Sequence, residues 1–121
     1  MTRSRNPKDI AGSAKPPLHL IPGPARVLVS LAMKDGALKY GPFNWRETPV
    51  EASNYTAACE RHIAAWFDGE ECASDSGISH IAHAIASLMI LLDAQQCGSL
   101  VDDRPKAGAT AKLIEQNTVS K

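Results

Sequence analysis

The chain has 121 residues, of which 44% are hydrophobic and 21% are charged. This composition is typical of a globular domain and excludes a disordered or membrane-embedded protein. Its 13 basic and 13 acidic residues give a formal net charge of zero, so net charge does not attract it to nucleic acid or to an anionic membrane. We therefore expect one domain with one core, and neither nucleic acid nor a membrane as a partner.

Three cysteines, Cys59, Cys72 and Cys97, form no CxxC pair. An odd number without close pairing argues against a disulfide framework and favours a reducing compartment. The longest apolar segment, residues 81–92, is shorter than the roughly 20 residues that span a bilayer. No N-terminal segment has the pattern of a signal peptide. We therefore expect a soluble, cytoplasmic protein.

Composition divides the chain into three parts. Residues 1–14 are polar and basic with no periodicity, which predicts a flexible basic arm. Residues 15–97 are expected to form the helical domain, and residues 98–121 a partly ordered extension with, at most, a short fourth helix. Within residues 15–24, four prolines exclude a helix and predict an extended apolar strip.

A first helix is predicted from Pro24, where proline suits the first turn. Apolar residues then recur at helical spacing as far as the pair at positions 35–36, with a continuation through Tyr40 left open. Residues 39–46 read as a loop because of the Gly-Pro pair. Their aromatic, amide and cationic side chains are of the kind found in ligand-binding loops, but composition alone favours the alternative, an aromatic plug at the end of the core.

Two further helices are predicted around an acidic connection. The second runs from about Pro49 to Asp68-Gly69. The third runs from Gly77 to about Gln96 and is capped by Asp75 or Ser76. It is apolar on nearly every side, so it is predicted to lie at the centre of a bundle or in a subunit interface. No strand-like alternation is present, and the fold class is therefore predicted as all-α, with three main helices completed by oligomerisation.

The start of the third helix carries the chemistry. His80 and His83 are three residues apart, so they lie on one helical face and could share an ion or hold a phosphate. The nearby Glu70, Glu71 and Asp75 provide oxygen ligands, which select hard cations such as Mg²⁺ or Mn²⁺. The alternative is a solvated turn in which Asp75 stabilises the helix N-terminus electrostatically.

A zinc site is a further alternative. Cys72, His80 and His83 are suitable donors, but a closed zinc site needs a fourth ligand, from Cys59, His62 or an acid. The motifs P-loop, GxGxxG, GxSxG and HExxH are absent, as is the His-Asp dipeptide of one class of phosphohydrolases.

Four blocks in this order resemble one family: Lys15 to Pro22; Lys39-Tyr40-Gly41-Pro42 with Asn44-Trp45-Arg46; Arg61-His62 with Trp66 and Gly69-Glu70; and Ser76-Gly77 with His80, His83 and Ala84. They are similar to the N-terminal domain of phage dATP/dGTP diphosphohydrolases, which are MazG-like all-α nucleotide pyrophosphohydrolases. The dGTP-cleaving phage form is called MazZ. The resemblance covers residues 15–92.

This resemblance implies that a purine deoxynucleoside triphosphate, dGTP or dATP, is hydrolysed to monophosphate and pyrophosphate with Mg²⁺ or Mn²⁺. The implied catalytic residues are Glu70, Asp75 and His80. The implied metal ligands are Glu60, Glu70, Glu71, Asp75, His80 and His83. The implied substrate-binding residues are Lys15, Lys39, Asn44, Trp45, Arg46, Arg61 and His62.

The chain departs from the wider MazG-like superfamily, whose helices carry ExxE and ExxD, because neither spacing occurs here. The competing hypothesis is a non-enzymatic helical interaction or regulatory module, with or without structural zinc. In either case a three-helix bundle with an apolar last helix would expose much of its core as a monomer. We therefore expect a homodimer or homotetramer.

Overall fold

The computed structural model describes residues 4–120; Arg3, which belongs to the predicted basic arm, lies outside the described residues. In chain order the elements are α1 (Pro7–Gly12), a 3₁₀ turn η1 (Leu18–Leu20), α2 (Gly23–Tyr40), α3 (Asn44–Glu47), β1 (Val50–Glu51), α4 (Ala52–Phe67), α5 (His80–Cys97), β2 (Leu100–Val101) and α6 (Thr110–Gln116). Helices dominate and three of them are long, which confirms the predicted fold class.

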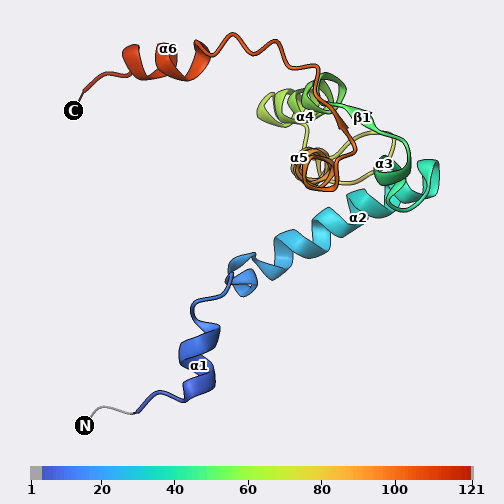
Figure 1. Ribbon diagram of the computed structural model, residues 1–121. Helices are drawn as coiled ribbons and strands as arrows, with labels where there is room; N and C mark the ends of the chain where they lie inside the picture. The colour runs from blue at the N-terminus through green and yellow to red at the C-terminus, as the bar shows by residue number, and fades with distance from the viewer. Residues whose placement is uncertain (1–3, 121) are drawn as a thin grey trace.

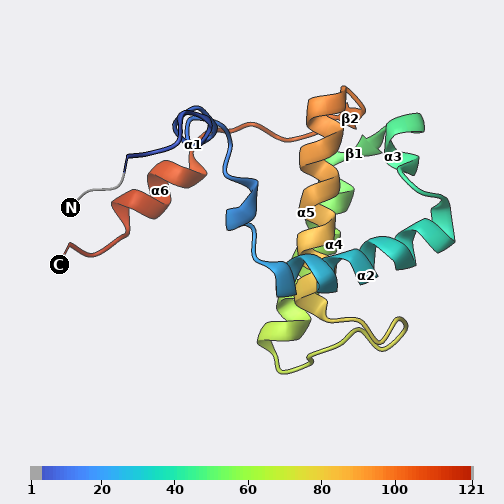
Figure 2. The ribbon, with the colours of Figure 1, turned by 90° about the horizontal axis from the view of Figure 1, so that it is seen from below.

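Helix α5 is the centre of the structure. It packs against α4 along its length and is crossed by α2 (Figures 1 and 2). The α2–α5 crossing buries Val29 and Ala32 against Ala82 and Ala86. Alanine lets two helix backbones approach closely but fills little volume. Accordingly, no large side chain within the described residues is fully buried.

Helix α2 is longer than the 35–36 stop predicted, and the continuation through Tyr40 is confirmed. Gly36 costs about 1 kcal/mol in a helix interior, yet the helix passes through it. The Asp35 carboxylate binds the Lys39 ammonium one turn later at 3.1 Å, which supports the helix across the glycine. The helix ends at Gly41, whose φ of 93° is open to glycine and costly for other residues.

Helix α5 begins three residues later than predicted. Its N-cap is Ser79, whose Oγ accepts a hydrogen bond from the backbone N–H of Ala82 at 3.3 Å. The expectation that Asp75 or Ser76 caps this helix is therefore wrong. Both residues lie in a preceding turn that Gly77 closes, with a φ of 71° and its N–H bonded to the Ala73 carbonyl at 2.8 Å.

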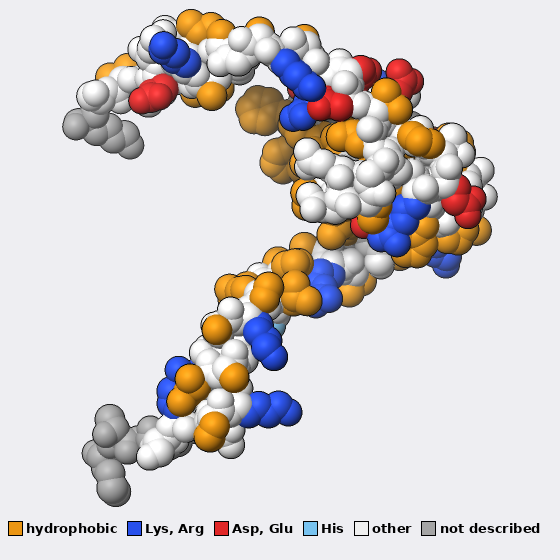
Figure 3. Space-filling model, in the orientation of Figure 1, with side chains coloured by type: hydrophobic (Ala, Val, Ile, Leu, Met, Phe, Trp, Pro, Cys, Tyr) orange, Lys and Arg blue, Asp and Glu red, His pale blue; other side chains and the backbone are white. Residues whose placement is uncertain are grey.

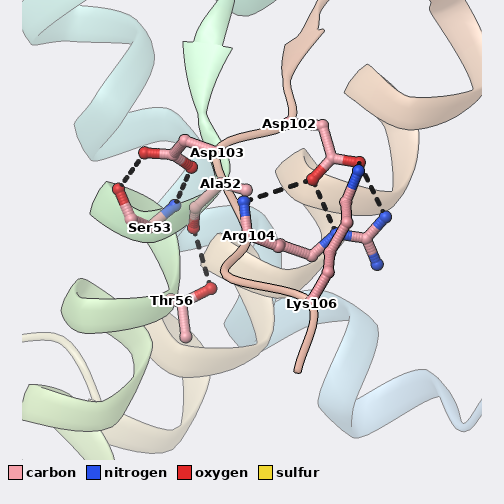
Figure 4. A network of polar contacts seen from close by, with 7 residues as sticks. All are labelled: Ala52, Ser53, Thr56, Asp102, Asp103, Arg104 and Lys106. Atoms are coloured by element: carbon pink, nitrogen blue, oxygen red, sulfur yellow. Dashed lines mark hydrogen bonds and ion pairs between the residues drawn. The ribbon is translucent and has the colours of Figure 1, made fainter. Parts of the chain in front are cut away.

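A two-stranded parallel ladder joins the chain after α5 to the start of α4, pairing Val50 with Leu100 and Glu51 with Val101. The sequence did not predict it, because two residues are too few to show alternation. Just beyond the ladder, the Asp103 carboxylate accepts hydrogen bonds from the backbone N–H of Ser53, at 2.8 Å, and from the Ser53 hydroxyl (Figure 4).

Asp103 thus caps α4 from fifty residues away. The N-cap residue Glu51 makes no side-chain capping bond, so the distant carboxylate satisfies an N–H group that the helix itself leaves open. The positive end of the helix dipole adds to the attraction. The segment after α5 is therefore part of the folded body as far as residue 103, although the predicted domain boundary at 97–98 stays a prediction.

Replacing Asp103 with alanine is expected to lower the melting temperature by several degrees, since a lost helix cap destabilises a small domain. Asp102 provides a matched control. Its bonds to Arg104 and Lys106 stay within the same exposed segment (Figure 4), so Asp102→Ala should change the melting temperature much less. Equal melting temperatures for the two variants, followed by circular dichroism, would contradict the capping role.

Large apolar surfaces remain uncovered. Helices α1 and α6 extend away from the body on the same side, and Figure 3 shows hydrophobic side chains along the N-terminal arm together with several lysines and arginines. On α5, Leu88 and Leu92 lie one turn apart and are 52% and 61% exposed. Within the described residues, no helix is sufficiently long and apolar to cross a membrane.

Candidate active site

A pocket of about 760 Å³ lies between the C-terminal half of α2, the segment 40–45 and α5. Figure 2 shows how α2 crosses α5 and continues toward α3. Its wall contains the aromatic side chains of Tyr40, Trp45 and Tyr55. Its polar groups come from the side chains of Ser30, Lys34, Asp35, Lys39, Asn44, His83, Ser87, Asp93 and Gln96. A pocket of this size with mainly apolar walls and a few polar groups is typical of small-molecule sites.

Three histidines gather where α4 meets the start of α5. The Nδ1 atoms of His62 and His80 lie 2.8 Å apart, and the ring of His62 stacks on that of His83 with centroids 4.7 Å apart. The Nε2 atom of His80 lies 2.6 Å from Glu70 Oε1. Glu70, His80 and His62 therefore form a continuous hydrogen-bonded chain.

This chain fixes the protons on two imidazoles. A Glu70 carboxylate accepts, so Nε2 of His80 must donate to it. In a neutral ring Nδ1 of His80 is then the acceptor, and Nδ1 of His62 donates to it. The lone pair of His62 is thereby left on its Nε2 atom. The arrangement resembles the carboxylate–histidine pairs that orient a general base.

Burial and the neighbouring imidazoles lower the pKa of His62, and burial is the main cause of the lowered pKa of His83. The Nε2 atom of His83 also lies 2.8 Å from the Ser76 hydroxyl. Because His83 lines the pocket and stacks on His62, it connects the histidine cluster to the pocket.

The lowered pKa values predict a pH dependence of stability. The ordinary value is 6.5, so folding favours the neutral rings: stability is complete above pH 6.5 and is lost as pH falls through the lower folded-state pKa values. Thermal melts with chelator present should therefore show a falling melting temperature below pH 6.5. His62→Asn should flatten the fall, whereas replacing the exposed His19 should not. Equal pH dependence in both variants would contradict this assignment.

Lys39 links the pocket to the acidic turn. Its ammonium lies 3.1 Å from Asp35 and 3.9 Å from Asp75, and the hydrogen bond to Asp35 is the main cause of its raised pKa. Hydrogen bonds from backbone N–H groups, its own and that of Ser76, lower the pKa of Asp75. The end of the pocket nearest His83 therefore contains an ammonium group that is paired with carboxylates.

At the opposite end of the pocket, Asp93 of α5 accepts hydrogen bonds from Trp45 Nε1 at 2.7 Å and from Arg46 Nε and Nη2, both at 2.8 Å. The Arg46 and Trp45 donors hold the pKa of Asp93 at about 2, well below its usual range. Trp45 thus lines the pocket with its N–H group already bonded, and Arg46 has its charge balanced by Asp93.

The structure brings some of the predicted site residues together. Lys39, Asn44, Trp45 and His83 line the pocket, and Glu70, His62 and His80 form the adjoining cluster. Within residues 4–120 no hydrogen bond or ion pair joins the other predicted side chains to these groups; they are Lys15, Glu60, Arg61 and Glu71. Their roles stay predictions.

The side chains that could bind a metal ion lie mainly in one part of the structure. Carboxylates are concentrated in the turn between α4 and α5, and oxygen donors suit a hard cation. As placed, however, no three His, Cys, Asp or Glu side chains in the described part of the chain are close enough to hold one ion. The zinc alternative, which requires Cys72 with the two helical histidines, is likewise not assembled among these residues.

The family described as dATP/dGTP diphosphohydrolase, N-terminal, matches residues 5–104 of this chain. The chain belongs to this family. The match includes the pocket, the histidine cluster and the Asp103 cap. Comparisons with curated proteins and with solved structures give no match. Family membership confirms the resemblance that the four sequence blocks indicated.

Several residues of this family member's site were missed. The sequence predicts no site role for Asp35, which was expected to end a helix, for Ser76, which was expected to cap α5 and belongs to the fourth family block, or for Tyr55. The sequence could have identified Asp93 as a residue with a specific partner, because it is the one Asp, Glu, Lys or Arg in α5. A lone, partly buried carboxylate on a mainly apolar helix needs a hydrogen-bond partner, and that need points to a cation elsewhere in the chain.

Proposed function

We propose that the protein hydrolyses a purine deoxynucleoside triphosphate, dGTP or dATP, to the monophosphate and pyrophosphate. The observation that carries this proposal is the family match, because it extends over the entire pocket and the adjoining histidine cluster. The geometry supports it in two ways: the pocket has the size and lining for a nucleoside, and a group suited to proton transfer lies at one end.

In this proposal the nucleobase occupies the aromatic part of the pocket. Tyr40 and Trp45 provide flat apolar surface, and the Asn44 amide supplies both a donor and an acceptor for a base edge. The triphosphate then lies toward His83, where Lys39 contributes positive charge. This orientation places the bond to be cleaved beside the histidine cluster.

Hydrolysis requires that a water molecule lose a proton as it attacks phosphorus. We assign this proton to the Glu70–His80–His62 chain, in which Glu70 orients His80 and the unprotonated Nε2 of His62 is available as acceptor. The bond between the α and β phosphates breaks as the new bond to water oxygen forms, and pyrophosphate leaves. A positioned base of this type contributes about 10²- to 10⁴-fold to a rate.

Divalent metal is part of the proposal, because a triphosphate is repelled by the acidic turn unless cations lie between them. Glu70 and Asp75 are the proposed ligands of Mg²⁺ or Mn²⁺. Further ligands are proposed among Glu60, Glu71, His80 and His83. When bound, such an ion supplies charge neutralisation and lowers the pKa of bound water. Since these donors do not converge as placed, no step is assigned to the ion.

We further propose that a second copy of the chain covers the apolar face of α5, forming a homodimer or homotetramer in the cytoplasm. Light scattering coupled to gel filtration should then give at least twice the mass of one chain. Leu92→Arg, on the exposed α5 face, should reduce the assembly. Leu113→Arg, equally apolar but on α6, should not. A monomeric mass for the wild-type protein would contradict the proposal.

The experiment that tests the activity is a substrate panel. Each deoxynucleoside and ribonucleoside triphosphate is incubated with the full chain and Mg²⁺ or Mn²⁺, and the products are separated by ion-exchange chromatography. Turnover of dGTP or dATP to monophosphate is the expected result. Absence of turnover for every nucleotide with both ions would overturn the proposal and favour an interaction module.

A further inference from the structure

Asp93 is unusual among the residues of α5. It is the single Asp, Glu, Lys or Arg in eighteen residues, and its side chain is 31% exposed. Burying part of a carboxylate against an apolar helix is costly unless it is hydrogen-bonded. Three donors from one short segment meet that requirement: Trp45 Nε1, Arg46 Nε and Arg46 Nη2.

The segment that supplies these donors is weakly structured by itself. Helix α3 has four residues, and an isolated helix that short is unstable in water. Its N-cap residue Phe43 has a φ of 54°, in the left-handed region that disfavours a bulky side chain. A contact from outside must therefore hold the segment, and the bonds to Asp93 are polar contacts that join α3 to α5.

The same segment organises the aromatic wall. The Arg46 guanidinium lies 4.8 Å from the centroid of the Phe43 ring, and the rings of Phe43 and Trp45 are 5.5 Å apart. Because Arg46 and Trp45 share one carboxylate, Asp93 fixes all three side chains relative to α5. Trp45 lines the pocket, so fixing it defines the pocket's shape before any ligand enters.

We propose that Asp93 is a positioning residue that pins Trp45 and Arg46 to α5 and so preorganises the pocket for a flat, aromatic ring. The substrate part of this inference rests on the proposed function. In this role Arg46 acts through Asp93 and does not contact phosphate, because its guanidinium forms a bidentate hydrogen-bonded pair with the Asp93 carboxylate. A preorganised wall lowers the cost of binding and leaves the chemical step unchanged.

Asp93→Asn is the direct test, with Asp102→Asn as matched control. Asp102 also accepts hydrogen bonds from an arginine, Arg104, through Nε and Nη2 at 2.7 and 2.8 Å, but away from the pocket. Asp93→Asn is expected to raise KM about tenfold with kcat nearly unchanged, the pattern for lost binding energy that is not specific to the transition state. Asp102→Asn should leave both values at wild-type level. An unchanged KM for Asp93→Asn, or the same rise in both variants, would overturn the proposal.

A double-mutant cycle separates pinning from phosphate binding by Arg46. If Arg46 acts only through Asp93, then Asp93→Asn combined with Arg46→Gln should raise KM no more than the stronger single change. If Arg46 binds phosphate itself, the two effects should multiply, and that result would refute the shared role. If Asp93→Asn fails to fold, Arg46→Lys is the second variant. It keeps the positive charge but cannot form the bidentate bond to Asp93, so it is expected to raise KM similarly.

Tryptophan fluorescence tests the pinning without turnover. In a Trp66→Phe background, Trp45 is the single tryptophan. Adding Asp93→Asn should increase acrylamide quenching and shift emission to longer wavelength, and adding Asp102→Asn should not. If the wild-type protein hydrolyses no nucleotide, the proposed function fails while this measurement still decides the pinning. If turnover is present but quenching and KM are unchanged by Asp93→Asn, the positioning role alone fails.

Discussion

Replacing Glu70 with glutamine is expected to lower kcat about 100- to 1,000-fold, in the range for loss of a positioned acid–base group. The amide keeps the size of the side chain but removes the charge that the 2.6 Å bond to His80 requires. Glutamine can also donate to His80, which allows the opposite tautomer and leaves His62 without its fixed lone pair. The change therefore disrupts the entire Glu70–His80–His62 chain.

Single-turnover and steady-state kinetics with saturating substrate measure this effect, and circular dichroism confirms that the variant is folded. Glu115→Gln in α6 is the control, because it removes the same charge from an exposed helix outside the pocket. Glu70 is itself more than half exposed, so its loss should have little effect on folding. A Glu70→Gln enzyme with wild-type kcat would eliminate the histidine chain as the proton acceptor.

Removing divalent metal is expected to reduce turnover to the background rate. Glu70 is an exposed carboxylate bonded to His80, and Glu60 and Glu71 are exposed carboxylates predicted as further metal ligands. Unscreened like charges oppose substrate binding. Mg²⁺ or Mn²⁺ would restore both binding and rate, because two of the predicted substrate-binding cations, Lys39 and Arg46, are already paired with carboxylates. The expected loss is at least several orders of magnitude, as for reactions that depend on a metal ion.

The measurement is turnover after dialysis against a chelator, followed by titration with Mg²⁺, Mn²⁺ and, as a control of different size and geometry, Ca²⁺. Melting temperatures recorded in parallel distinguish a catalytic ion from a structural one, since a structural ion stabilises the fold. Full activity after chelation would show that the acidic turn does not act through metal.

Periodicity predicted the main helices because their apolar positions are local in sequence. The same reasoning could not locate the cap of α5, since Asp75, Ser76 and Ser79 are all acceptable caps and the left-handed Gly77 decides among them. The β1–β2 ladder and the Asp103 cap join residues about fifty positions apart. No local pattern encodes such a pairing.

The candidate site shows the same division. His80 and His83 were recognisable as one helical face, but the contacts of His62 with both of them depend on how α4 packs against α5. Trp45 and Arg46 were predicted as ligand contacts from the family resemblance, whereas their bonds to Asp93 arise from tertiary contact. Residue types were therefore predictable from sequence, and their partners were not.

The most direct test of the account is the identity of the products that the wild-type protein forms from dGTP. Phosphorus NMR of a reaction with Mg²⁺ or Mn²⁺ distinguishes pyrophosphate from orthophosphate in one spectrum. The account predicts dGMP and pyrophosphate in equal amounts, with no dGDP. Formation of dGDP and orthophosphate, or an unchanged dGTP spectrum, would contradict it.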